Sequence, residues 1–207
     1  MVVEPNTRKR QKELRRDQII DAALSVFSAK GYSAASIRDI AKTVGVTEGL
    51  LYHYFESKEQ LLYECWKERS WRPQLERILS EAEGKPIDVV LTELLTDFLK
   101  TLRENAPMVR MCATEMQSNP VMSEAHCKRI QENQNLIISF LKSRQELGEI
   151  RSGFAPHIPA TLLLGSAYSA FLLFGTLGDT DWNDLATDLV KSGVDVVMNG
   201  IHQNCIV

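Results

Sequence analysis

The chain has 207 residues, of which 44% are hydrophobic and 25% charged, and its formal net charge is −3. This length and apolar content suit one large globular domain or a small domain joined to a larger one. The small net charge excludes a protein that coats nucleic acid along its whole length. However, residues 1–58 carry ten Lys and Arg against seven Asp and Glu, whereas the remainder carries 14 against 20. A basic N-terminal segment on an acidic body indicates that this segment meets an anion.

The cysteines and the apolar segments bear on the compartment. The four cysteines have no C-x-x-C spacing and no leader-like segment opens the chain, so we expect a reducing, cytoplasmic protein with no metal site. Residues 158–178 carry no charge and are long enough to span a bilayer. Pro159, several hydroxyl residues and an acidic flank favour a buried helix and no membrane partner.

Apolar residues recur at intervals of three and four along nearly the whole chain, which predicts an all-α protein. After a basic tail at residues 7–16, a first helix is expected to stop at Gly31. Ser36 is then expected to begin a second helix that ends at Gly45, and Thr47 to begin a third. Three short helices within about 45 residues form one compact unit.

Longer helices are predicted for the rest of the chain, which gives about nine in total. The first of them is expected to be interrupted or kinked near Pro73. Turn-forming residues separate the others. We therefore predict a DNA-binding domain at 1–57 and a helical ligand-binding and dimerisation domain at 58–207. The predicted longer helices cover residues 58–82, 87–104, 107–117, 121–147, 157–177 and 182–202.

The second and third helices have the spacing of a helix-turn-helix, whose second helix enters the DNA major groove. The order of parts is Ser36-x-x-x-Ile40-Ala41-x-x-x-Gly45-Val46-Thr47-x-x-x-Leu51-Tyr52-x-Tyr54-Phe55-x-x-Lys58-x-x-Leu61. This pattern resembles the DNA-binding domain of the TetR family of bacterial transcriptional regulators, and the helical remainder resembles that family's body. The resemblance implies a homodimer that binds a palindromic operator and responds to a small molecule.

DNA contacts follow from the residue types and from the resemblance. The resemblance places Arg38, Thr47, Glu48 and Gly49 nearest the bases, where Arg can pair with guanine and Glu can accept from cytosine. Other polar side chains and helix N-termini suit phosphates, which position the domain without reading sequence. Packing, or a solvated surface, is the alternative role for His53, Tyr54 and Lys58. The predicted phosphate contacts are Ser36, Tyr52, His53, Tyr54 and Lys58, with added attraction from a basic arm formed by Arg8, Lys9, Arg10, Lys12, Arg15 and Arg16.

The body is rich in aromatic and sulfur-containing side chains, which suit an adaptable apolar cavity as well as they suit a plain core. The family resemblance implies an effector between the long fourth helix and the helices after it. An apolar or aromatic effector fits this composition. The implied lining is Trp66, Phe98, Met111, Cys112, Glu115, Phe140 and Tyr168.

Glu115 stands on the same helical stripe as Met108, Met111 and Cys112, so its carboxylate needs a partner. That partner is either the effector or an internal group, such as an arginine or a helix N-terminus. The sequence leaves both roles open.

The last two expected helices mix apolar and small residues, which favours close packing in a four-helix dimer interface, with an intramolecular core as the alternative. We therefore expect an operator-binding repressor, released by an effector and needing no cofactor. The alternative keeps the DNA-binding domain but makes the body a protein-interaction module without a small ligand. Scattered histidines and the lack of a nucleophile motif argue against an enzyme.

Overall fold

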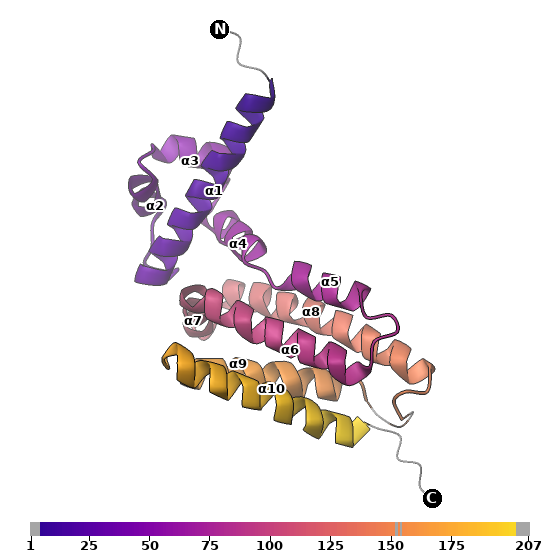
Figure 1. Cartoon of the computed structure of the whole chain (residues 1–207). Helices are drawn as coiled ribbons and strands as arrows, with labels where there is room; N and C mark the ends of the chain where they lie inside the picture. The colour runs from indigo at the N-terminus through magenta and orange to yellow at the C-terminus, as the bar shows by residue number, and fades with distance from the viewer. Residues whose placement is uncertain (1–4, 152, 154, 202–207) are drawn as a thin grey trace, which may run out of the picture. The chain divides into compact units, whose positions relative to one another are not determined.

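The computed structural model describes residues 5–151, 153 and 155–201, and within these residues it contains helices and no strands (Figure 1). The predicted all-α fold class is confirmed. The helices are α1 (Pro5–Lys30), α2 (Ile37–Val44), α3 (Glu48–Tyr54), α4 (Lys58–Glu68), α5 (Arg72–Ser80), α6 (Ile87–Glu104), α7 (Ala106–Glu115), α8 (Pro120–Glu146), α9 (His157–Phe174) and α10 (Asp179–Ile201).

The helices group into two compact units, one of residues 1–70 with 107–123 and the other of residues 71–106 with 124–207. We call them the head unit and the body unit. The sequence predicted a division after residue 57. The structural division differs because α4 packs against α1, and because α7 belongs with the N-terminal helices.

The head unit is built on α1, which packs against α2 and α4. The basic segment at residues 7–16, expected as a tail before the first helix, lies inside α1, so that expectation was wrong. The reason is local: the segment holds good helix formers such as Arg, Lys, Gln and Glu, and Pro5 is tolerated in a first turn. The inward stripe of α1 includes Ile20, Ala23 and Phe27, all almost fully buried.

The single helix expected over 58–82 is two helices, α4 and α5. The break lies at residues 69–71, just before Pro73, which occupies the first turn of α5. Proline lacks the amide proton that a continuous helix would need from it, whereas a first turn does not require that proton.

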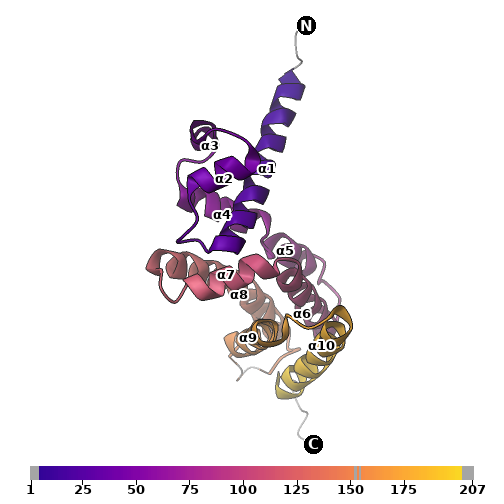
Figure 2. The ribbon, with the colours of Figure 1, turned by 90° about the vertical axis from the view of Figure 1, so that its left-hand side faces the viewer.

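The body unit is organised around α6, which packs against α5, α9 and α10. Its inward positions carry an almost unbroken row of branched side chains, among them Val90, Leu91, Leu95 and Leu99. α9 and α10 pack against each other and are joined by the short turn at residues 175–178 (Figures 1 and 2). Cys205 and His202, both considered in the sequence, lie outside the described residues.

Candidate DNA-binding and effector sites

The turn between α2 and α3 is fixed by caps at both of its sides. Ser36 Oγ accepts from the amide of Asp39 at 3.1 Å, and the Asp39 carboxylate accepts in return from the Ser36 amide at 3.1 Å. Gly45 ends α2 in the left-handed region at φ +75°, which strains any other residue type except Asn or Asp. Thr47 Oγ1 then accepts from the Leu50 amide at 3.2 Å and begins α3.

Asp39 also reinforces the cap electrostatically. Its carboxylate lies 2.7 Å from the Lys30 ammonium. The hydrogen bond from Lys30, followed by those from Ser36, lowers the pKa of Asp39 to about 2. The carboxylate is therefore ionised at neutral pH, in the first turn of α2, where the helix dipole favours negative charge.

The side chains expected to read bases are all exposed. Arg38 projects from the first turn of α2, and Thr47, Glu48 and Gly49 stand at the start of α3. Sequence reasoning missed Leu50, which follows them and is 39% exposed although it is a large apolar side chain. The missed signal is its position: an apolar residue next to the buried Leu51 cannot lie on the same side of a helix.

The aromatic cluster of α3 divides between the interior and solvent. Leu51 and Phe55 are 0% and 2% exposed, so they fix α3 to the core of the head unit. Tyr52 is 50% exposed and His53 is also exposed, which leaves both able to reach a phosphate. Tyr54 is half-buried, with its ring centroid 5.6 Å from that of His53 and 6.5 Å from that of Phe55.

Lys58 faces the turn between α1 and α2. Its ammonium lies 4.3 Å from the ring centroid of Tyr32 and donates to the Ser33 carbonyl at 3.5 Å. Desolvation by burial lowers its pKa, while the charges of Glu59 and Glu115 act in the opposite direction. In this position Lys58 organises the turn, so a phosphate contact would require the side chain to swing outward.

The basic arm is not uniform. Arg8, Lys9, Arg10, Lys12 and Arg15 are exposed along the first turns of α1. Arg16 instead forms ion pairs with Glu64 and Glu68 of α4, the second at 2.9 Å. Arg16 thereby joins α1 to α4 and its charge is largely neutralised.

Of the residues expected to line an effector site, four belong to the head unit. Trp66 and Cys112 are brought together: the Trp66 indole N–H donates to Cys112 Sγ at 3.1 Å, and both side chains are buried. Met111 is also buried, at 6% exposed. These three side chains join α4 to α7.

Glu115, at the end of α7, binds the turn between α1 and α2. Its carboxylate accepts from the Ser33 amide at 3.1 Å and from the Ser33 hydroxyl at 2.7 Å. Partial burial raises the pKa of Glu115, but these hydrogen bonds outweigh it and the pKa is lowered overall. A Cβ added to Gly31, which has φ +80°, would lie 2.8 Å from Glu115 Oε1. The turn therefore closes tightly around this carboxylate, which has an internal partner at Ser33.

The other three residues belong to the body unit. Phe98 is half-buried and its ring centroid lies 4.6 Å from that of Trp71, whose indole N–H donates to Asp97 at 2.9 Å. Phe140 is buried, with the Arg144 guanidinium 5.1 Å from its ring centroid. Tyr168 is half-buried on α9.

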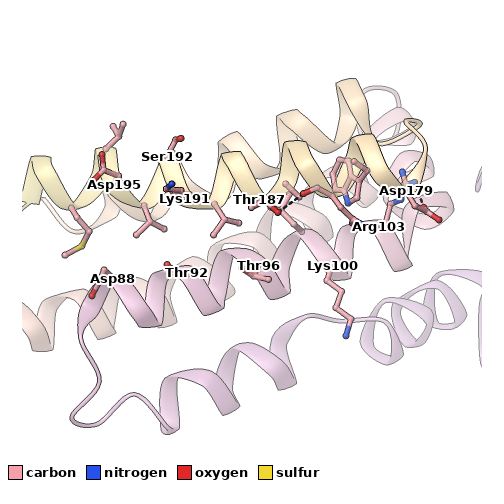
Figure 3. Close-up of a pocket in the computed structure, with 18 of the residues that line it drawn as sticks. Asp88, Thr92, Thr96, Lys100, Arg103, Asp179, Thr187, Lys191, Ser192 and Asp195 are labelled. Carbon is pink, nitrogen blue, oxygen red and sulfur yellow. Dashed lines mark hydrogen bonds and ion pairs between the residues drawn. The ribbon is translucent and has the colours of Figure 1, made fainter.

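The body unit also has an open groove of about 1300 Å³ between α6 and α10 (Figure 3). Its walls carry charges of both signs, including Asp88 and Lys100 on α6 and Lys191 and Asp195 on α10. At one end Arg103 donates to the Leu177 carbonyl at 2.7 Å and to Asp179 at 3.1 Å. None of the residues expected to bind an effector lines this groove.

The inner face of α8 carries polar side chains that sequence reasoning did not single out as a group. His126 is 3% exposed and Asn133 is 8% exposed, and Arg129 lies between them in the sequence. Their spacing of three and seven residues is visible in the sequence, but without a known buried face it cannot be distinguished from surface. Over residues 5–151, 153 and 155–201, no group of three or more metal-binding side chains could hold a metal ion.

One face of α9 is apolar and exposed. Ala160, Leu163, Ala167 and Phe171 are buried, so the expectation of a buried helix holds for one side only. The same helix is long and apolar enough by length and composition to cross a membrane. Its exposed large side chains are Ile158, Leu162, Leu172, Leu173 and Phe174, and α10 adds Val196 at 69% exposed.

Comparison with known proteins gives consistent matches. Residues 19–65 match the model of bacterial regulatory proteins of the tetR family. The chain is 27% identical to the fatty acid metabolism regulator protein of Bacillus subtilis, over 93% of this chain and 98% of the relative. It is 41% identical over 54 residues to the transcriptional repressor KstR2 of Mycolicibacterium smegmatis, which is 26% of each chain. The structure of B. subtilis FadR in complex with stearoyl-CoA matches with a TM-score of 0.72 at 24% identity, over 89% and 98% of the two chains.

The capped helix-turn-helix with its exposed recognition residues, set on an all-helical body, defines a DNA-binding transcription regulator and not an enzyme. Together with the matches in sequence and fold, it shows that the chain belongs to the TetR family of bacterial regulators. The expected family is thereby confirmed.

Proposed function

We propose that the protein is a cytoplasmic homodimeric repressor that binds a palindromic operator through α3 and leaves it when a small effector binds to the body. The observation that carries this proposal is the exposed set of side chains at the starts of α2 and α3, held in place by capped helices. The proposal combines this surface with an uncovered apolar face and with a relative that binds a ligand.

Base recognition is assigned to Arg38, Thr47, Glu48 and Leu50. Arg38 suits the two acceptors of guanine in the major groove, and Glu48 suits the amine of cytosine. The exposed Leu50 adds an apolar contact that fits the methyl group of thymine. Gly49 has no side chain, so α3 can approach the bases closely at that point.

Phosphate contacts are assigned to the rim of the same surface. Tyr52 and His53 are exposed on α3, and the hydroxyl of Ser36 lies at the start of α2. The N-terminus of α2 offers backbone amides and a positive dipole end to an anion. Tyr54 contributes through its half-buried ring, and Lys58 contributes once it leaves the Tyr32 ring.

Dimerisation is assigned to the apolar face of α9 and α10. Leu162, Leu173 and Val196 are 57%, 72% and 69% exposed, which is costly for side chains of this size in water. Small residues such as Gly165 and Ser169, also exposed on α9, let a second copy of the helix approach closely. Pairing by a two-fold axis would present two recognition helices to successive major grooves, which matches a palindromic operator.

Effector binding is assigned to the body because the fatty acid metabolism regulator of B. subtilis is similar along its whole length, and a FadR structure holds stearoyl-CoA. The residues proposed to contact the effector are Trp66, Phe98, Met111, Cys112, Phe140 and Tyr168. For Glu115, the hydrogen bonds to Ser33 favour a structural role. An effector acts by binding the DNA-incompetent state more tightly than the other state.

The test is selection of bound DNA from a random pool, followed by affinity measurements on the selected operator. A palindromic consensus is expected. Arg38→Ala should weaken binding by about 1–3 kcal/mol at one symmetric base pair and relax the preference there. Lys58→Ala is the matched variant: it should weaken operator and random DNA alike and lower the salt dependence.

Three results would count against the proposal. A selected pool without symmetry would contradict the dimeric operator. Equal losses of specificity in Arg38→Ala and Lys58→Ala would contradict the division between base and phosphate contacts. Operator binding that no small molecule changes would instead support a body that binds another protein.

A further inference from the structure

The inner face of α8 combines a cation with neutral hydrogen-bonding groups inside the body unit. His126, Arg129 and Asn133 follow one another at intervals of three and four residues, so they lie on one side of the helix. His126 and Asn133 are among the few buried polar side chains of the described residues. Burying such groups is unfavourable unless they are hydrogen-bonded, so their presence requires a reason.

The geometry of the pair fixes its chemistry. Arg129 Nη2 lies 3.1 Å from His126 Nδ1. A guanidinium only donates, so Nδ1 must be the acceptor and the ring proton must sit on Nε2. Burial, with a smaller contribution from the charge of Arg129, lowers the pKa of His126 to about 4. At neutral pH the pair therefore carries one positive charge and offers N–H groups from both side chains.

These N–H groups are screened from solvent. His126 Nε2 and Arg129 Nε are both buried atoms. Electrostatic interactions are stronger in such a place than in water, because little solvent competes for the donors. A positively charged set of donors away from water is suited to a group that only accepts, such as a carboxylate or a phosphate.

We propose that His126, Arg129 and Asn133 form the subsite that binds the anionic group of the effector. The inference rests on the proposed function, since it names the chemistry of the molecule to which the regulator responds. Arg129 supplies the charge, His126 supplies a neutral donor from Nε2, and the Asn133 amide supplies a further hydrogen bond.

The second buried arginine of α8 shows what a structural role looks like in the same helix. Arg144 is 7% exposed, and its Nη1 lies 3.1 Å from each carboxylate oxygen of Glu149. Its Nη2 donates to the carbonyl of Ala82. This guanidinium closes the end of the bundle with a carboxylate of the chain itself, whereas Arg129 holds an uncharged imidazole.

An apolar region follows the polar subsite along α8. Ile137, one turn beyond Asn133, lines a gap of about 10 Å³ together with leucines of α6 and α9. The gap has a purely apolar lining and is at the lower limit for one water molecule. Arg129 and Ile137 are about 12 Å apart along the helix axis. The effector class that fits both regions is an amphipathic anion, with its chain directed toward Ile137.

The experiment compares probes of one chain length and different head groups: decanoate, decanoyl-CoA, decanol and decyltrimethylammonium. Binding to the full-length protein is measured by calorimetry, and release of the selected operator is measured in parallel. Decanoate or decanoyl-CoA should bind about ten-fold or more tightly than decanol, and the ammonium probe should bind weakest. A preference for one anion over the other identifies carboxylate or phosphate as the bound group.

Variants then test the named residues. Arg129→Met keeps the bulk and removes the charge, so it should lower the affinity for the anion by about ten-fold or more and leave decanol unchanged. Arg129→Lys should retain the preference for anions. His126→Gln keeps a terminal N–H and should lose less affinity than His126→Leu. Lys128→Met removes an exposed charge from the next residue but one on α8 and serves as the control.

Each outcome decides between the inference and its rival. Equal binding of decanol and decanoate by the wild-type protein, or a parallel loss of both probes in Arg129→Met, would overturn the inference. Operator release by decanol alone would also overturn it while preserving a ligand-responsive regulator. Failure of the wild-type protein to select any operator would contradict the proposed function itself, independently of the binding of the probes.

Discussion

The helices of the head unit and those of the body unit begin in different ways. α2, α3 and α4 each start with a hydroxyl residue, at Ser36, Thr47 and Ser57, that accepts from a backbone amide in the first turn. α5, α6 and α9 have no side-chain hydrogen bond at their N-caps. Helices of seven to eleven residues are marginal alone, so the head helices need caps, whereas the long body helices are stabilised by packing.

The largest expected effect comes from a charge placed on the packing surface of the body. Leu173→Glu puts a carboxylate into the proposed α9 interface twice, once from each subunit. The dissociation constant of the dimer should rise by about 100-fold or more, with a similar loss of operator affinity. Sedimentation velocity at micromolar concentration measures the first effect. Val89→Glu, at another exposed apolar side chain of the body unit, should leave both unchanged.

A second test uses pH to separate the body from the head. The folded-state pKa of His126 is lowered from 6.5 to about 4, so the unfolded chain binds a proton more readily. The stability from neutral His126 is therefore complete above about pH 6.5 and is lost as the pH falls toward 4, by about 3 kcal/mol at most. Urea unfolding across this range measures the loss. His126→Gln should flatten this part of the profile, and an unchanged slope would contradict the assignment.

A third test concerns the closed turn in the head unit. Gly31→Ala should cost about 2–3 kcal/mol, since it adds strain at φ +80° and forces Glu115 away from Ser33. Gly148 has a similar φ of +79° with open space around it, so Gly148→Ala should cost only about 1–2 kcal/mol. In a Glu115→Ala background the difference between the two glycines should disappear. Free energies of unfolding from denaturant titration give this comparison.

The smallest expected effect tests the caps directly. Ser36→Ala should cost about 1 kcal/mol and speed the hydrogen exchange of the first α2 amides. The same change at Ser192, an exposed serine in the interior of α10, should be neutral or slightly stabilising because Ala favours helix. Equal effects at both positions would show that the head does not depend on its caps. Asp39 adds a separate signature: its stabilisation is complete above about pH 4 and is lost as the pH falls toward 2.

The same contrast explains what the sequence could predict. The bounds of α2 and α3 were predicted closely, because their caps and the turn glycine stand next to the helices that they delimit. The start of α1 was misplaced because a run of basic residues looks like a tail although its intrinsic preference is helical. In the body, the helix at 87–104 was predicted with the bounds of α6, since its apolar periodicity is strong.

The contacts that could not be predicted join residues far apart in the chain. Ser33 and Glu115 are separated by 82 positions, and Trp66 and Cys112 by 46. Nothing in the local sequence signals such a pair, because each partner is compatible with solvent or with several other neighbours. The placement of Lys58 over Tyr32 belongs to the same class. The local sequence carried the recognition surface, whereas these long-range links required a structure.

The bond between Glu115 and Ser33 also bears on how regulators of this kind can be recombined. α7 is grouped with the head although it lies beyond α6 in the chain. A chimera that joins residues 1–70 to the body of a relative would replace the owner of the carboxylate and leave the turn at Gly31 to accommodate a foreign side chain. Exchanging DNA specificity therefore means transplanting α7 together with the head, or choosing a recipient whose helix ends in an acid at the same place.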